Sequence, residues 1–567
     1  MDCREMIVSE DYMSIVLDFR LPEQYWSGED FCYQPIDGNL GVYYINRRIQ
    51  SPLLYSEYLY RYIPQLYGLE SAPGAGSREF NPGPLETSGI LTQQRAPLEL
   101  NGDRTVIGLI DTGISYENPV FRYSDGSSRI LAIWDQTDQS GEPPEGFAYG
   151  TLYTQEQINE ALGSDDPHSI VSERDEIGHG TAMASVAAGS SLEEGIAFTG
   201  AAPQAQIVVV KLKPAKQHLR EYYLIADDVP AYASEDLMFG VKFVQSFSIP
   251  FSRPAVICLG MGTSLGSHNG SSLFSVYLQL VARQLGCAVI LSGGNEGNAA
   301  GHFRAPMTQQ AQWAELRVGE NTKGFSAQLW GVEPANFRVS IRSPGGEVIP
   351  EADFRVDREV DYTFVYEKTR VRLSFRRYER NASEVPIFMR FETPTPGVWG
   401  ISVRSSDDVR NAVFDLWLMP RQFIGGEVFF LTPEPEVTLT IPSFVPDAVT
   451  VSSYDSQNGS FYYNSGQGFS ADGQMIKPDL AAPGVGISTA LGPYTGGAMA
   501  AAITAGAAAQ LMQWAVVEEN APFTAGREIR DYLRNGARQS SFIEYPSPQW
   551  GYGQLNMKGT FDKIAGR

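Results

Sequence analysis

Short apolar runs alternate with helical stretches from residue 105 onward. The apolar runs are Val106–Ile110, Ala205–Leu212, Ala255–Leu259 and Ala288–Ser292, and the helical stretches between them include Gly180–Gly189, Ser234–Phe247 and Ser271–Leu285. Continuous apolar strands separated by helices are typical of a parallel sheet covered on both faces. The pattern therefore predicts an α/β domain, whose chemistry gathers where the strands end.

The pattern differs on either side of this region and inside it. Residues 1–95 carry strand patterns at Ser14–Phe19 and Gly41–Asn46, then a loop rich in Gly, Pro and Ser at Ser71–Pro84. From 305 to 441 the residues alternate between apolar and polar with few helix signals, which favours an inserted antiparallel β domain. We therefore predict an N-terminal domain at 1–95, an α/β domain at 96–304 and 442–567, and an insertion at 305–441.

The composition narrows the classes of partner. Hydrophobic residues make up 43% of the chain and charged residues 19%, which is typical of globular proteins. The net charge of −23 argues against nucleic acid and anionic membranes, because both bind basic surfaces. We expect Met499–Val517, an Ala-rich run with Thr504 and Gln510, to be a core helix and not a membrane span.

The first residues and the cysteines favour an intracellular protein. The start is acidic and has no basic region followed by an apolar core, so we expect no secretory signal. Cys3, Cys32, Cys258 and Cys287 form no close pair in sequence, and we expect reduced, buried thiols. With five histidines and no HExxH motif or Cys/His cluster, we expect no metal and no cofactor.

Four short motifs lie where a serine hydrolase needs its groups. Asp111 ends an apolar strand, His179 opens a helix of small residues, and Asn295 follows two glycines. Serine hydrolases use a carboxylate to orient an imidazole, the imidazole to take the hydroxyl proton, and donors for the oxyanion. The fourth motif, Thr495–Gly506, predicts a tight turn that opens into a buried helix, a position that suits a nucleophile. That position holds Ala498, which has no nucleophilic atom.

These motifs resemble those of subtilisin-like serine proteases, the subtilases. The order Asp, His, nucleophile matches the subtilisin order, and Asp-Thr-Gly at 111–113, Gly-His-Gly-Thr at 178–181, Gly-Asn-Glu-Gly at 294–297 and Lys-Pro-Asp…Ala-Pro-Gly at 477–484 are subtilase signatures. Within the family, the segments at 130–137, 262–270 and 500–506 resemble the Csp germination proteases of clostridial spores. The resemblance implies an N-terminal α+β prodomain, a subtilisin-like parallel sheet and an inserted β jelly-roll domain.

The chain departs from the subtilase pattern at the reaction centre. The family's Gly-Thr-Ser-Met-Ala is Gly496-Gly497-Ala498-Met499-Ala500 here, and the substrate-edge Ser-Leu-Gly is Gly260-Met261-Gly262. By resemblance, Gly260, Met261, Gly262, Ser292, Gly293 and Gly294 line the substrate cleft, with Asn295 as oxyanion donor. A single serine-to-alanine change explains Ala498 but not Gly497 or Gly260, which favours a natural pseudoprotease.

Three functions stay open at this point. The first is a pseudoprotease that regulates spore germination or takes part in germinant signalling, with other Csp-family proteins and a cortex-lytic hydrolase precursor as partners by resemblance. The second is an active endopeptidase that cuts such a precursor, with its nucleophile replaced by Ala498. The third is a structural spore-coat protein. For the first, we expect an uncleaved prodomain whose arm at Thr92–Arg95 lies in the cleft along Gly260–Gly262, in a spore-associated protein without a membrane span.

Overall fold

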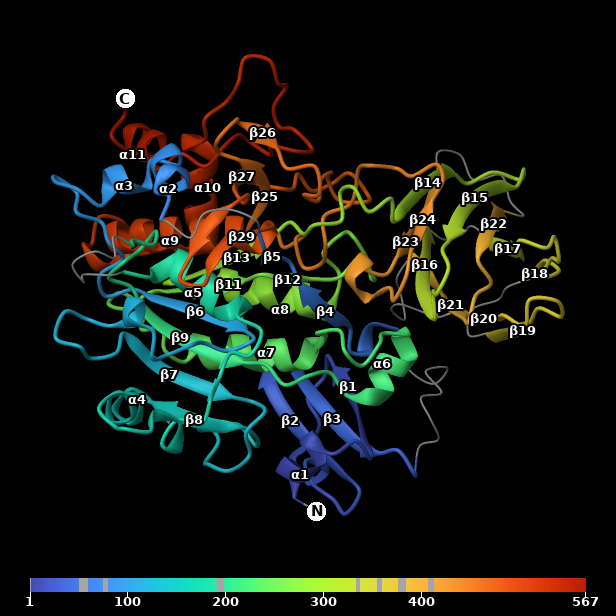
Figure 1. Ribbon diagram of the computed structural model, residues 1–567, viewed down its shortest axis with the longest axis horizontal. Coiled ribbons are helices and arrows are strands. Elements are labelled where there is room, and N and C mark those ends of the chain that lie inside the picture. Colours follow the sequence, from blue (N-terminus) through green and yellow to red (C-terminus); the bar gives the residue numbers. More distant parts are fainter. Residues whose placement is uncertain are drawn as a thin grey trace.

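A nine-stranded sheet forms the centre of the protein (Figure 1). The computed structural model describes residues 2–49, 60–74, 80–190, 198–332, 337–353, 359–375, 384–405 and 412–567. The strands of the central sheet are β6 (Val106–Asp111), β7 (Ile130–Asp135), β8 (Thr151–Thr154), β9 (Gln206–Lys211), β11 (Ala255–Leu259), β13 (Cys287–Ser292), β25 (Val449–Asp455), β26 (Ser460–Phe461) and β27 (Leu480–Pro483). Their order is β26-β25-β13-β11-β6-β9-β7-β8, and β27 pairs with β25. All pairs are parallel except β7 with β8 and β25 with β26, so the predicted parallel sheet is present.

Helices cover both faces of this sheet. On one face, α5 (His179–Ala188) and α9 (Gly497–Met512) share a core with Ile107 and Leu109 of β6. On the other face, α7 (Ser234–Gln245) and α8 (Leu273–Ala282) share a core with the alternate residues of the same strand. Because successive side chains of a strand point to opposite faces, a strand covered on both sides must be apolar throughout. The alternation of strands and helices places Asp111, the last residue of β6, at the carboxyl edge.

The Ala-rich helix is the central helix of this core. Every residue of α9 is buried, and a π-helical turn extends it over Gln513–Val517. Alanine combines high helix propensity with a small side chain, which lets the helix approach the sheet closely. By length and composition Gly497–Val517 could cross a membrane, but 94% of its apolar window is buried inside the protein.

The other helices lie around the main domain. Two short helices near the predicted domain boundary, α2 (Gly83–Thr87) and α3 (Ile90–Gln93), place Leu85 and Ile90 in the core shared with α5 and α9. The predicted boundary at residue 95 therefore falls after two helices that belong to the main domain. The remaining helices are α4 (Gln155–Leu162), α6 (Gln217–Tyr223), α10 (Gly526–Gly536) and α11 (Met557–Ile564).

The N-terminal part is a small α+β unit against the α7 face (Figure 1, dark blue). It consists of α1 (Cys3–Val8) and a three-stranded antiparallel sheet of β1 (Tyr12–Leu17), β2 (Phe31–Asp37) and β3 (Leu40–Asn46) in the order β1-β3-β2. Lys216 fixes this unit to the main domain: its ammonium donates to the carbonyls of Ser9 and Tyr12, at 2.8 Å each. Of the predicted loop Ser71–Pro84, residues 75–79 lie outside the described residues.

The cysteines correct one expectation from the sequence. Cys3 and Cys32 form a disulfide that joins α1 to β2, so the interpretation of four reduced thiols is wrong for this pair. They are 29 residues apart in sequence, and only the fold brings their Cα atoms to 5.5 Å. Cys258 and Cys287 are free and buried, as expected.

The insertion is an antiparallel β-sandwich beside the main domain (Figure 1, right). One sheet has the order β14-β23-β16-β21-β20-β19 and the other β18-β17-β22-β15-β24. Side chains of both sheets, such as Leu329 and Ile401, share one apolar core. The strands are β14 (His302–Pro306), β15 (Gln312–Val318), β16 (Gly324–Val332), β17 (Phe337–Arg342), β18 (Ala352–Asp353), β19 (Glu359–Thr363), β20 (Arg370–Phe375), β21 (Glu384–Glu392), β22 (Gly397–Ser405), β23 (Val413–Leu418) and β24 (Val428–Phe430). Jelly-roll connectivity stays a prediction.

Candidate active site and the segment that fills it

Asp111 and His179 form a buried pair at the carboxyl edge of the sheet. His179 Nδ1 lies 2.8 Å from Asp111 Oδ1, and both side chains are 2% exposed. His179 is the first residue of α5, after Gly178 in the left-handed conformation with φ of 83°. Burial lowers the pKa of His179, but the charge and hydrogen bond of Asp111 outweigh it and the net shift is upward. The other ring nitrogen, Nε2, is buried and has no hydrogen-bond partner within the described part of the chain.

Asp175, which the sequence analysis did not single out, holds the start of α5. Its carboxylate accepts hydrogen bonds from the backbone N–H groups of Gly178 and Thr181, at 2.8 Å each. It also accepts the hydroxyl of Thr112, the residue after Asp111, at 2.7 Å. Asp175 thus links the strand that carries the carboxylate to the helix that carries the imidazole. No local signal marked this role, because Asp175 lies three residues before the N-cap, Gly178.

The backbone carbonyl of Glu70 occupies the position of a substrate carbonyl. Asn295 Nδ2 donates to Glu70 O at 2.7 Å, and the backbone N–H of Ala498 donates to the same oxygen at 3.1 Å. Asn295 is held in turn by the backbone N–H of Gly497, which lies 3.0 Å from its Oδ1. Two donors at these distances around one oxygen are the geometry of an oxyanion hole. Asn295 thus lies beside Ala498, and both residues donate to the same oxygen.

The chain around Glu70 runs through the cleft as an added strand. Before Glu70, β4 (Leu66–Leu69) pairs antiparallel with β12 (Met261–Gly262) and, on its other side, with β10 (Tyr232–Ala233). Gly260 O accepts the Glu70 N–H at 3.0 Å. After Ser71, β5 (Ala72–Pro73) pairs with β29 (Gly492–Thr495), which itself pairs with β28 (Ile487–Thr489). The peptide bond between Glu70 and Ser71 thus lies directly at the site.

The segment in the cleft is not the predicted one. The expectation that Thr92–Arg95 occupies the cleft along Gly260–Gly262 is wrong: Ile90–Gln93 is helical, and Gln94 Nε2 donates to Gly200 O at 3.0 Å instead. The physical reason is that Ile90 is an apolar anchor for the core under α9, while β4 has the extended, apolar pattern that edge pairing needs. The bond presented to the site is therefore 70–71 and not one near residue 94.

The Glu70 side chain is buried among hydroxyls and glycines. It is 2% exposed, and Oε1 accepts a hydrogen bond from Thr440 Oγ1. Burial raises the pKa of Glu70 to about 7, against smaller lowering effects of Ser292 and Thr440. A Cβ atom on Gly262 would overlap Glu70 Oε1, so only glycine there leaves room for this carboxyl. Neither Glu70 nor Thr440 was singled out from the sequence.

The predicted cleft residues lie around this segment in different ways. Gly260, Met261 and Gly262 pair with it directly. Ser292 and Gly294 lie beneath Glu70: Gly294 N donates to Ser292 Oγ at 3.1 Å, and a Cβ on Gly294 would be 2.5 Å from Thr440 Oγ1. Gly293 lies behind them, where its N–H bonds to Val451 O at 2.8 Å.

Small residues fill the space around position 498. A Cβ on Gly260 would overlap Met183 and lie 2.7 Å from Ala498 Cβ. A Cβ on Gly497 would overlap the hydroxyl of Ser292. Ala498 itself contributes only a methyl group, which cannot attack a carbonyl carbon. The arrangement can therefore bind and polarise a peptide carbonyl, but position 498 supplies no nucleophile.

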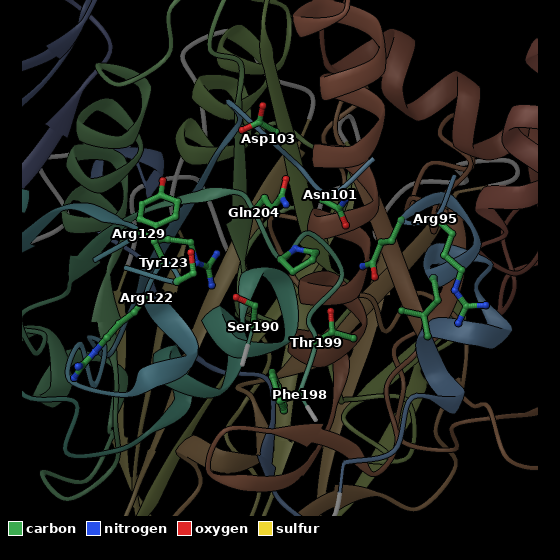
Figure 2. Close-up of a pocket in the computed structure, with 14 residues that line it drawn as sticks. Arg95, Asn101, Asp103, Arg122, Tyr123, Arg129, Ser190, Phe198, Thr199 and Gln204 are labelled. Atoms are coloured by element: carbon green, nitrogen blue, oxygen red, sulfur yellow. The ribbon is translucent and has the colours of Figure 1, made fainter. Parts of the chain in front are cut away.

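A second cavity, of about 720 Å³, lies away from this site (Figure 2). None of the predicted site residues is among the residues that line it. Arg129, its most buried side chain, already donates to the carbonyls of Val120 and Ala205, at 2.7 and 2.9 Å. Figure 2 shows Arg95 and Arg122 at opposite ends of the view, so the basic groups do not converge.

Sequence comparison identifies the class of protein that this fold and site define. Residues 102–347 and 431–553 match the subtilase family, peptidase family S8, and the chain belongs to that family. Its subtilisin-like α/β fold is therefore as predicted.

Particular relatives cover different shares of the chain. It is similar to the subtilisin-like proteases SBT3.5 and SBT3.3 of Arabidopsis thaliana, each 29% identical over 218 residues, which are 35% of this chain and 26% of the relative. The chain thus spans about a quarter of the length of these curated relatives. The CspB protease of Clostridium perfringens is structurally similar with a TM-score of 0.74 and 29% identity, over 85% of this chain and 99% of that one.

Proposed function

We propose that this chain is a pseudoprotease: a subtilase that binds a peptide segment in its cleft and does not cut it. One observation carries the proposal. Both oxyanion donors, Asn295 and the Ala498 N–H, hold the carbonyl of Glu70, while position 498 offers only a methyl group to the adjacent carbonyl carbon. Removing the serine of a subtilisin costs about 10⁶ in turnover, the value measured for that enzyme. The N-terminal part then stays covalently attached.

The neighbours of Ala498 support a natural loss over a single substitution. The family's threonine would stand at Gly497, where a Cβ atom would overlap the Ser292 hydroxyl. The family's serine at Gly260 would overlap Met183. At both positions the surrounding side chains leave space only for glycine. A single serine-to-alanine change at position 498 does not explain this packing.

The similarity to CspB supports a proposal for the biological role. We propose a spore-associated protein that regulates germination or takes part in germinant signalling. Its proposed partners are other Csp-family proteins and the precursor of a cortex-lytic hydrolase. The cleft segment supports a binding role, because it shows that this cleft holds a peptide strand through backbone pairing.

Intact mass tests the proposal directly. We expect purified protein to retain the full chain, and the Ala498→Ser protein to remain uncut as well. A break between Glu70 and Ser71 in the unaltered protein would refute the pseudoprotease, provided that a chain with Asn295→Ala and Glu70→Lys, purified in parallel, stays intact and so excludes a contaminating protease.

A second function is favoured by the geometry of Asp111 and His179. A 2.8 Å carboxylate–imidazole pair is what an active protease needs, and the 70–71 peptide bond is positioned for attack. In this alternative the chain is an endopeptidase for a cortex-lytic hydrolase precursor, with alanine in place of its serine. Rapid self-cleavage of the Ala498→Ser protein at 70–71, abolished by His179→Ala, would establish it.

A further inference from the structure

Glu70 is the one carboxylate of the cleft segment, residues 66–73, and no Lys or Arg side chain of the described residues pairs with it. Its Oε1 accepts the Thr440 hydroxyl, and the charged or titratable groups that act on it are Glu296 and His179. Glu296 repels a negative charge at this position. A buried, ionised carboxylate without a cation partner is strongly unfavourable, whereas a neutral carboxyl fits a site of hydroxyl groups.

The shape of the pocket selects the length of the side chain. Gly262 and Gly294 form its walls, since a Cβ on Gly262 would overlap Glu70 Oε1 and one on Gly294 would overlap the Thr440 side chain. The backbone of Glu70 is fixed at the same time, by its N–H to Gly260 O at 3.0 Å and its carbonyl to Asn295. The side chain must therefore reach Thr440 from a fixed Cα.

A second anchor lies three residues before Glu70. Tyr67 is fully buried, and its ring packs edge to face against Phe274 with centroids 5.5 Å apart. Gly68, which lies between Tyr67 and Glu70, leaves no room for a larger side chain, because a Cβ atom there would overlap the side chain of Gln422. The segment is thus held by an aromatic side chain, a glycine and a carboxyl at fixed spacing.

We propose that this cleft is a receptor for a partner peptide that carries glutamic acid or glutamine at the position of Glu70 and an aromatic residue three positions earlier. The proposal rests on the binding function proposed above and names its ligand class. Thr440 is a specificity-determining residue, because its hydroxyl donates to a carboxyl or carboxamide oxygen, and Ser292 acts on the same carboxyl by hydrogen bonding. The N-terminal segment of the chain is then a built-in competitor for the partner.

The pH dependence distinguishes the two ligand side chains. The pKa of the docked carboxyl is raised to about 7, and an exposed glutamate titrates near 4.5. Because the pKa of the carboxyl is higher in the bound peptide than in the free one, binding is strongest at pH values below the pKa of the free carboxyl. Affinity is lost as the pH rises through the pKa of the bound carboxyl. A glutamate peptide should therefore lose roughly 30-fold in affinity between pH 5.5 and 8, and a glutamine peptide should lose none through this group. Working above pH 5.5 also avoids the sequence pI of about 4.7.

Peptide binding to a chain with a weakened internal segment tests the proposal. In the Glu70→Lys protein the internal segment would place an ammonium group in the pocket. Because this weakens docking, we expect the backbone amides of the segment to exchange hydrogen at least tenfold faster than in the wild type. Fluorescent peptides with the sequence Gln65–Gly74 are then titrated against this protein, with Glu, Gln, Leu or Lys at position 70. We expect Gln and Glu to bind at pH 5.5 at least tenfold more tightly than Leu, and Lys not to bind. Glu23→Gln, at an exposed site of the N-terminal unit, is the matched control.

Thr440→Val in the same background should weaken the preference of the cleft for Gln over Leu, because valine keeps the shape and lacks the hydroxyl, while Ser292 remains. Equal affinities for the four peptides, or unchanged protection of the Glu70→Lys segment, would overturn the proposal. Either result leaves the intact-mass test of the pseudoprotease untouched. Conversely, a chain cut at 70–71 refutes the pseudoprotease whatever the peptides do.

Discussion

Replacing Asn295 by alanine should loosen the cleft segment and leave the rest of the fold in place. Asn295 makes two hydrogen bonds here: Nδ2 to Glu70 O at 2.7 Å and Oδ1 from Gly497 N at 3.0 Å. An intramolecular hydrogen bond contributes about 1 kcal/mol net, and a buried group left without its partner costs about 1–3 kcal/mol. Ala498 N still donates to Glu70 O, so the carbonyl keeps one donor. We therefore expect a loss of about 2 kcal/mol, or roughly 30-fold in the opening equilibrium of the segment.

Native-state hydrogen exchange measures this opening. The Glu70 amide, which donates to Gly260 O, should exchange roughly 30-fold faster in Asn295→Ala, while amides of the N-terminal sheet keep their wild-type rates. Asn458→Ala, in an exposed turn where the side chain bonds to Asp455, is the control and should change neither set. If the Glu70 amide exchanged at the wild-type rate, Asn295 would not hold the segment and the assignment of an occupied oxyanion hole would fail.

Four further outcomes are expected. Tyr67→Ala should cost the docked segment about 3–5 kcal/mol, seen as faster proteolysis between residues 66 and 73, whereas Tyr67→Phe keeps the packing on Phe274 and should resist. Gly262→Ala should release the segment, because its Cβ would overlap Glu70 Oε1 and the Thr440 side chain, and the triple change with Glu70→Ala and Thr440→Ala should restore part of the protection; no restoration would contradict the pocket geometry. The raised pKa of His179 means that its pair with Asp111 contributes stability below pH 6.5 that is lost as pH rises through the raised value, so a series of urea unfolding curves should show this loss in the wild type and not in Asp111→Asn. Thiol titration of unreduced, unfolded protein should count the free Cys258 and Cys287 and not all four cysteines; four reactive thiols would contradict the Cys3–Cys32 disulfide.

The elements that depend on local sequence patterns, namely the buried strands and the starts of the helices, could be predicted from the sequence. Continuous apolar runs such as Val106–Ile110 marked buried strands, and a Gly-flanked His179 marked a helix start, so the sheet and its helices were predictable. Asp111, His179, Asn295 and Ala498 each lie at the end of a strand or the start of a helix, where topology alone brings them to one edge. Asp111 and His179 are 68 residues apart in sequence, and the arrangement of the strands and helices, not a local sequence pattern, brings their side chains together.

What the sequence could not predict depends on pairing over long distances. The occupant of the cleft is chosen by competition among N-terminal segments, and the contacts of Glu70 with Thr440, 370 residues away, leave no local trace. The same holds for the disulfide, since Cys3 and Cys32 approach only after β2 packs on α1. Arg95 and its neighbours looked extended, yet Ile90 gains more from the core than an edge strand would give it.

If the chain is the pseudoprotease proposed above, the alanine at position 498 and the attached cleft segment are parts of one arrangement. A cut segment is held only by its noncovalent contacts and can dissociate, whereas an uncut segment stays a covalently tethered strand at high effective concentration. Any partner peptide then has to displace a segment already held by Asn295, Thr440 and the backbone of Gly260. A partner can shift this equilibrium only by binding the open cleft more favourably than the tethered strand does. The buried carboxyl of Glu70 makes that competition dependent on pH, because the internal strand docks less strongly once the carboxyl of the released strand ionises.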